Sequence, residues 1–179
     1  MRTRTLFLTR LVLLTAITLS LEMIGLPQPL TGPLVNMMLI FTTLVTNVYG
    51  GMALGALTPL IALLRGQLPP VLAAFVPFII LGNALFVLLF SVLQRRLRRT
   101  SWHTATAWPG IAIGALAKFA WLFISARFLL QIFVSAALPE KFIAMMTFPQ
   151  LLTALIGGGM ALAFYDLLVK RRIIRPALD

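Results

Sequence analysis

Residues 70–99 read PVLAAFVPFIILGNALFVLLFSVLQRRLRR, a long apolar run that ends in a cluster of arginines. A helix that crosses a membrane needs about 20 mostly apolar residues, because the hydrocarbon core is about 30 Å thick and each residue rises about 1.5 Å. The run at 70–93 meets this length, and the arginines after it are typical of the cytoplasmic end of a spanning helix. The stretch therefore predicts a transmembrane helix.

The composition of the whole chain extends this prediction. Of the 179 residues, 60% are hydrophobic and only 11% are charged. Soluble domains are about half apolar and about a quarter charged, so this chain lacks the polar side chains needed to coat a globule in water. We expect a single integral membrane domain that spans residues 1–179 and has an all-α fold.

Apolar segments recur along the chain at lengths that suit a bundle of six transmembrane helices. The expected segments are residues 6–25, 33–49, 51–64, 70–93, 109–135 and 148–169. The third segment is short and contains Pro59 and several glycines, so it is expected to be tilted, broken or re-entrant. If the second and third segments formed a re-entrant hairpin, two crossings would be lost together and the later helices would keep their orientation.

The basic residues predict the orientation of this bundle. The net charge is +11, from 15 Lys and Arg against 4 Asp and Glu. With a cytoplasmic N-terminus, the external connections hold only Arg65 and Lys141. The cytoplasmic ends then hold Arg2, Arg4, Arg10, Arg95, Arg96, Arg98, Arg99, Lys170, Arg171, Arg172 and Arg175. This asymmetry predicts that both termini are cytoplasmic, and it explains the basic charge without nucleic acid as a partner.

The residues needed for catalysis or for metal and cofactor binding do not form a recognisable group. The chain has no cysteine, its one histidine is His103 in a polar connection, and its four acidic residues are scattered. The stretch GIAIGALAK at 110–118 has the wrong Gly–Lys spacing for a phosphate-binding loop. We therefore expect neither enzymatic activity, nor a metal, nor a cofactor.

One region resembles a known family. Residues 32–70 read GPLVNMMLIFTTLVTNVYGGMALGALTPLIALLRGQLPP, and VPFIILGNALFVLLF follows at 76–90. With the six segments, the basic termini and the proline-rich loop after the first segment, the chain resembles the substrate-binding S components of energy-coupling factor (ECF) vitamin transporters. In that family the first helix carries an A-x-x-x-A motif that docks on the T component. The matching positions are Ala16 and Ser20, where serine replaces the second alanine but remains small.

The resemblance implies a function in the plasma membrane of a prokaryotic cell. An S component captures a water-soluble vitamin or related micronutrient outside, associates with a T component and two ABC ATPase subunits, topples in the bilayer and releases the substrate inside. Two other functions are compatible with the sequence. One is an accessory or assembly membrane protein without a ligand, and the other is a self-contained small secondary transporter.

Two basic residues in the fifth segment are candidates for substrate binding, because a charge within a membrane segment usually faces a protein interior or cavity. Lys118 and Arg127 are nine residues apart, which places them on opposite helix faces. Arg127 lies near the outer boundary. Lys118 lies deeper but shares its face with Trp121, a further candidate whose indole would stack on a flat ring of the substrate. Either cation would favour a substrate with a carboxylate or phosphate. Alternatively, Arg127 extends to the membrane surface, or Lys118 binds a structural partner such as Asp166 or Asn83.

Polar side chains elsewhere in the bundle add further candidates. Asn83 offers amide donors and an acceptor that suit a heterocycle or amide, or else an interhelical hydrogen bond. Asn36 and Gln150 are weaker candidates of the same kind. Arg65 and Gln67 lie in an external turn, where they would cap a pocket or contact lipid headgroups.

Glu22 stands near the outer end of the first segment, just before the stiff sequence GLPQP at 25–29. It would pair with Arg65 or Arg127, meet a substrate amine, or lie unpaired at the membrane surface. The loop that follows it would cover a pocket. Glycines 157–159 in the last segment are expected to let helix backbones pack closely.

Overall fold

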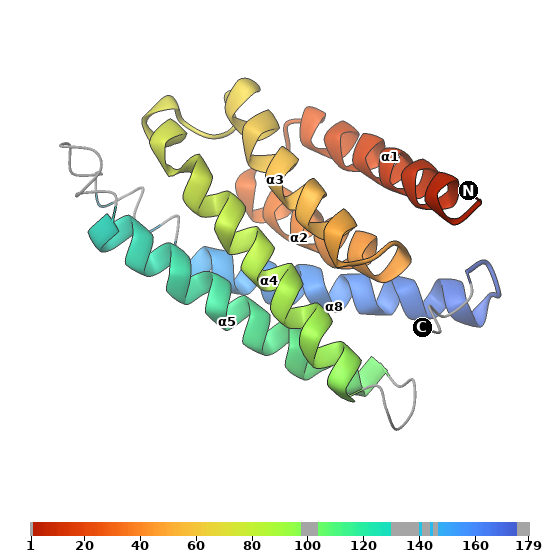
Figure 1. Ribbon diagram of the computed structural model, residues 1–179. Coiled ribbons are helices and arrows are strands. Elements are labelled where there is room, and N and C mark those ends of the chain that lie inside the picture. The colour runs from red at the N-terminus through yellow and green to blue at the C-terminus, as the bar shows by residue number, and fades with distance from the viewer. Residues whose placement is uncertain (1, 98–103, 130–139, 141–143, 145–146, 175–179) are drawn as a thin grey trace.

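The fold is described by a computed structural model that covers residues 2–97, 104–129, 140, 144 and 147–174 (Figure 1). The long helices are α1 (Arg2–Met23), α2 (Gln28–Val45), α3 (Val48–Leu64), α4 (Val76–Leu97), α5 (Trp108–Ile124) and α8 (Phe148–Lys170). Three short helical turns accompany them, η1 (Pro70–Phe75), η2 (Thr104–Ala107) and η3 (Ser125–Leu129). The described part of the chain contains no strand.

The helices form the predicted all-α membrane bundle. Five of them, counted in the described ranges, are long and apolar enough to cross a membrane, and α3 is a shorter apolar helix. Large apolar side chains on their outer faces are exposed, as a surface that faces lipid requires. The chain is therefore a multi-pass membrane protein.

The structure of helix α3 excludes one of the alternatives expected for the third segment. It is a single unbroken helix of 17 residues, although Pro59 lies within it. Asn47 starts the helix, because its side-chain oxygen accepts hydrogen bonds from the backbone N–H groups of Tyr49 and Gly50 at 3.0 and 3.1 Å. A broken third helix is therefore wrong.

The first external loop is shorter than the sequence predicted. Helix α2 begins at Gln28, five residues before the expected start at residue 33. Pro27 occupies the N-cap position and a second proline lies in the first turn, where a missing N–H costs no helical hydrogen bond. The turn between α1 and α2 depends on Gly25, whose φ of 74° favours glycine. The prolines thus start a helix rather than extend a loop.

Among the glycine positions, the closest approach to the backbone of another helix joins α2 to α8. A side chain added at Gly157 would place its Cβ only 2.4 Å from the carbonyl oxygen of Pro33 and 2.7 Å from the backbone nitrogen of Met37. Gly114 has a similar role between α5 and α4, since a Cβ there would lie 2.9 Å from the carbonyl oxygen of Phe86. The predicted packing role of the glycines in α8 is confirmed for Gly157.

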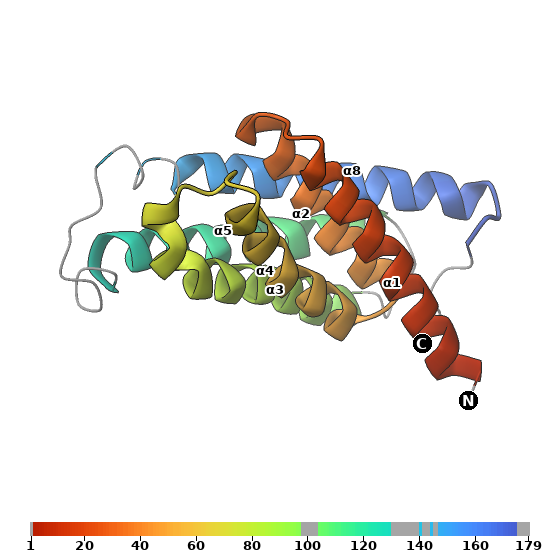
Figure 2. The ribbon, with the colours of Figure 1, turned by 90° about the horizontal axis from the view of Figure 1, so that it is seen from above.

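Helix α1 lies on the outside of the bundle, where it crosses α2 and contacts α3 (Figure 2). Only 17% of its most apolar stretch is buried, compared with 50% for α2. Ala16 and Ser20 both lie on its exposed face. The Ser20 hydroxyl donates to the Ala16 carbonyl at 2.9 Å, so the serine presents a satisfied, compact surface.

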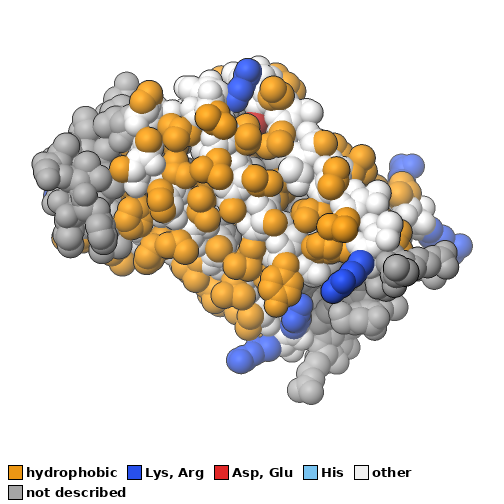
Figure 3. All heavy atoms as spheres, turned by 45° about the horizontal axis from the view of Figure 1, so that its top comes forward, with side chains coloured by type: hydrophobic (Ala, Val, Ile, Leu, Met, Phe, Trp, Pro, Cys, Tyr) orange, Lys and Arg blue, Asp and Glu red, His pale blue; other side chains and the backbone are white. Residues whose placement is uncertain are grey.

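Basic side chains gather at the end of the bundle where both termini lie (Figures 1 and 3). Arg95 and Arg96 stand in the last turn of α4, and Arg10 donates from Nη1 to the Val45 carbonyl at the end of α2 at 3.2 Å. Arg65 contacts the far end of α1, where its Nη2 donates to the Met23 carbonyl at 3.1 Å. The basic residues thus gather at one end of the bundle, and the cytoplasmic location of that end stays a prediction. Arg98, Arg99, Lys141, Arg175 and the predicted end of the fifth segment lie outside the described residues.

Candidate functional site

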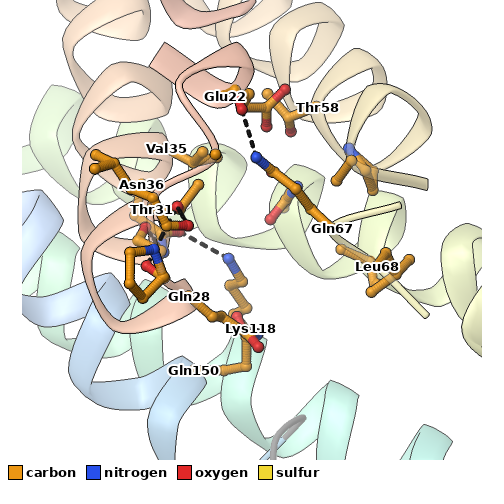
Figure 4. Close-up of a pocket in the computed structure, with 18 residues that line it drawn as sticks. Glu22, Gln28, Thr31, Val35, Asn36, Thr58, Gln67, Leu68, Lys118 and Gln150 are labelled. Carbon is orange, nitrogen blue, oxygen red and sulfur yellow. Dashed lines mark hydrogen bonds between the residues drawn. The ribbon is translucent and has the colours of Figure 1, made fainter. Parts of the chain in front are cut away.

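A cavity of about 370 Å³ lies among the helices at the end of the bundle opposite the two termini. Every long helix contributes to its wall, as do the turn after α1 and the connection between α3 and η1. Its polar lining residues are Glu22, Gln28, Thr31, Asn36, Thr58, Gln67, Asn83, Lys118 and Gln150 (Figure 4). In the predicted orientation this cavity faces the outside of the cell.

Lys118 projects into the cavity from α5 (Figure 4). It is 3% exposed, and its Nζ donates to the side-chain oxygen of Asn36 on α2 at 2.7 Å. Asn36 in turn donates to the Gly32 carbonyl at 2.9 Å and to the Thr153 hydroxyl at 3.4 Å, which fixes the amide. An ammonium group has further N–H donors beyond the one that Asn36 accepts. The cation is therefore held in place and can still bind another acceptor.

The structural partner of Lys118 differs from the two that the sequence suggested. Asp166 forms an ion pair with Lys170 at 2.7 Å, one turn further along α8. Asn83 donates to the Gly55 carbonyl at 2.9 Å and so ties α4 to α3, while it also lines the cavity. Both alternatives for the partner of Lys118 are wrong, and the neutral Asn36 amide takes that place.

Glu22 enters the cavity wall from the last turn of α1 (Figure 4). It is 2% exposed, and its Oε2 is buried without a hydrogen-bond partner in the described structure. Neither predicted arginine pairs with it, because Arg65 binds the Met23 carbonyl and Arg127 faces Glu140. An unpaired carboxylate at the membrane surface is wrong as well, because Glu22 is buried. Contact with a substrate amine stays a prediction.

Thr58 is a lining residue that the sequence did not single out. Its hydroxyl oxygen is also buried without a partner, and it lies beside Glu22 in the cavity (Figure 4). A lone threonine in an apolar helix carries no signal that separates a ligand contact from ordinary packing. Gln67 completes this end of the cavity, since its side-chain N–H donates to the backbone carbonyl of Glu22.

Two predicted binding residues lie outside the cavity lining. Arg127 belongs to η3, its side chain is half exposed, and its Nη1 lies 3.6 Å from the exposed carboxylate of Glu140. Trp121 donates from its indole N–H to the Phe78 carbonyl at 2.9 Å. Lys118 is buried and Arg127 is exposed, which agrees with the opposite faces predicted for them. Of the six predicted binding residues, the cavity brings together Asn36, Asn83, Lys118 and Gln150.

Comparison of the chain with family models, with curated proteins and with solved structures gives no match. The chemistry of the cavity is therefore the basis for inferring a function. Its volume lies within the range of small-molecule pockets, about 300–1,000 Å³. Its walls combine apolar surface with a few fixed polar groups, the pattern that orients a small polar ligand.

Proposed function

We propose that the chain is a membrane substrate-capture subunit, of the S component type found in ECF transporters. It binds a small water-soluble micronutrient from outside and delivers it inward with a T component and two ABC ATPase subunits. The observation that carries this proposal is the buried ammonium of Lys118 in a cavity of about 370 Å³.

A buried cation in a membrane protein is costly unless a partner compensates its charge. The Asn36 amide accepts one hydrogen bond but carries no charge, so it compensates the Lys118 ammonium only in part. A carboxylate or phosphate of the ligand would supply the missing charge and strengthen the hydrogen bonds. The proposed substrate therefore carries an acceptor group, and an anionic one is favoured.

The outer face of α1 supports the delivery step of the proposal. Ala16 and Ser20 are small exposed residues beside larger exposed side chains such as Leu13 and Ile17. Small residues let a second helix approach closely, and the internally bonded Ser20 hydroxyl leaves no unsatisfied donor against an apolar partner. Helix α1 is also the least buried of the spanning helices, so it has surface available for a T component.

A pull-down of the full chain from native membranes tests this function when proteins and released small molecules are both identified by mass spectrometry. We expect a T component, the ABC ATPases and one small polar compound. A protein partner without any small molecule would indicate an accessory protein. Uptake of the compound into proteoliposomes that contain this chain alone would indicate a secondary transporter.

A further inference from the structure

The two ends of the cavity carry ionisable groups of opposite type, an acidic side chain and a basic one. Glu22 and Thr58 lie at one end, while Lys118 lies at the other beside Gln28 and Gln150 (Figure 4). Glu22 and Lys118 do not form an ion pair with each other in the described structure. The cavity therefore keeps a carboxylate and an ammonium apart, and each remains available to a third group.

The helix ends strengthen this polarity. Glu22 belongs to the last turn of α1, and the C-terminal end of a helix carries negative partial charge. Gln28 and Gln150 belong to the first turns of α2 and α8, and the N-terminal end of a helix carries positive partial charge. The backbone thus favours a cationic group near Glu22 and an anionic group near Lys118.

The unpaired atoms at the Glu22 end are the independent sign of a ligand. Both Oε2 of Glu22 and the hydroxyl of Thr58 are buried without a hydrogen-bond partner. Buried polar groups are satisfied in the great majority of structures, so two orphans on one cavity wall call for an occupant with donors. An ammonium or a similar N–H group satisfies both oxygens at once.

We propose that the cavity recognises a dipolar small molecule, with a protonated amine or similar N–H donor against Glu22 and Thr58 and a carboxylate or phosphate against Lys118 and Asn36. This inference rests on the proposed function, because it names the class of substrate that the captured compound belongs to. A zwitterion enters such a cavity without adding net charge to the membrane interior. A simple anion or cation leaves one buried charge unmatched.

The selective retention of compounds from a defined mixture tests the proposal. The purified full-length protein, in nanodiscs, is incubated with equimolar standards from four charge classes, and the retained compounds are identified by mass spectrometry. A size-matched quartet is included: para-aminomethylbenzoate as the zwitterion, para-methylbenzoate as the anion, para-methylbenzylamine as the cation and para-methylbenzyl alcohol as the neutral compound. We expect zwitterions to be retained about tenfold over the single-charge classes, since a charge-assisted hydrogen bond is worth at least that factor.

Two substitutions test which end of the cavity binds which charged group of the ligand. Glu22→Gln keeps the shape of the side chain and removes the charge, so the preference for zwitterions over anions should disappear. Lys118→Met should remove the preference for zwitterions over cations. Thr42→Val is the matched control, because the Thr42 hydroxyl is also buried without a partner but lies outside the cavity lining. This variant should retain the wild-type selectivity.

The outcomes separate this inference from the proposed function. Equal retention of zwitterions and anions, or unchanged selectivity in Glu22→Gln, overturns the dipolar ligand while substrate capture survives. Retention of no class by the wild-type protein overturns both. Selective retention of zwitterions without copurifying ATPases supports the dipolar site and removes the assignment as an S component.

Discussion

The contact between α2 and α8 and the cavity beside it show two opposite uses of the same turn of α2. On one side, the backbone of Pro33 and Met37 approaches Gly157 so closely that no side chain would fit. From the same turn, the Asn36 side chain reaches the Lys118 ammonium in the cavity. Helix α2 thus packs directly against α8 where Gly157 has no side chain. Where the same turn borders the cavity, it presents a polar side chain instead.

Substitution at Gly157 should have the largest effect, because the clash involves backbone atoms that cannot rotate away. Gly157→Ala should lower the free energy of unfolding by about 1–3 kcal/mol, and Gly157→Leu should prevent a folded, monodisperse protein from being obtained. Thermal unfolding and size-exclusion chromatography in detergent provide the measurement.

Gly82→Ala is the matched control for this substitution, since its Cβ would meet only side-chain atoms at 3.4 Å, an ordinary contact. Its unfolding temperature should stay near that of the wild type. An equal loss of stability in Gly157→Ala and Gly82→Ala would show that close backbone approach is not what holds α2 against α8.

Substitution at Asn36 should have the next largest effect, on the open side of the same turn. Asn36→Ala removes the amide that accepts from Lys118 and leaves a buried ammonium without that partner, at a cost of about 1–3 kcal/mol in the free energy of unfolding. Adding Lys118→Met should recover part of this loss, because the orphaned donor is then gone. A double-mutant cycle on unfolding temperatures measures the coupling, and strictly additive effects would argue against the contact.

Ser20→Leu examines the outer surface of α1, which belongs neither to the tight contact nor to the cavity. Stability should change by about 0.5 kcal/mol or less, because the residue is exposed. Under the proposed function, copurification of the T component should fall while retention of the small molecule persists. Loss of the small molecule together with the partner would contradict separate surfaces for capture and docking.

Arg127→Ala should have the smallest effect of the series. The side chain is half exposed, and its contact with the exposed Glu140 is a surface ion pair worth about 0–1 kcal/mol. Ligand retention by Arg127→Ala, measured in parallel with Lys118→Met, should remain at the wild-type level. A loss as large as that of Lys118→Met would show that the external surface around η3 takes part in binding.

The sequence predicted the helices well, because the length and polarity of a membrane span are set by the bilayer and are visible in one dimension. It placed the start of α2 five residues late, since prolines at 27 and 29 were interpreted as loop residues and in fact begin a helix. Helical phase predicted different surroundings for Lys118 and Arg127, and the first is buried while the second is exposed. Which of the two faced a cavity depended on the neighbouring helices, and their arrangement is not a property of the α5 sequence.

Partners across helices were the part that sequence reasoning could not supply. Lys118 binds Asn36, which lies 82 positions away in the chain, and no local pattern links the two. The unpaired state of Glu22 is equally non-local, because it depends on where Arg65 and Arg127 finally point. The residue types thus indicated candidate binding residues, and only the packing of the helices showed which of them line the cavity.

The attachment of α1 to the connection between α3 and η1 has an evolutionary consequence. Gln67 and Arg65 hold α1 through the main-chain carbonyls of Glu22 and Met23, so the attachment does not depend on the side chain at position 22. A carboxylate, an amide or a hydroxyl at that position would leave the hold on the helix intact. Under the proposed ligand recognition, single substitutions at position 22 would change the chemical selectivity of the cavity while the architecture around it stays the same.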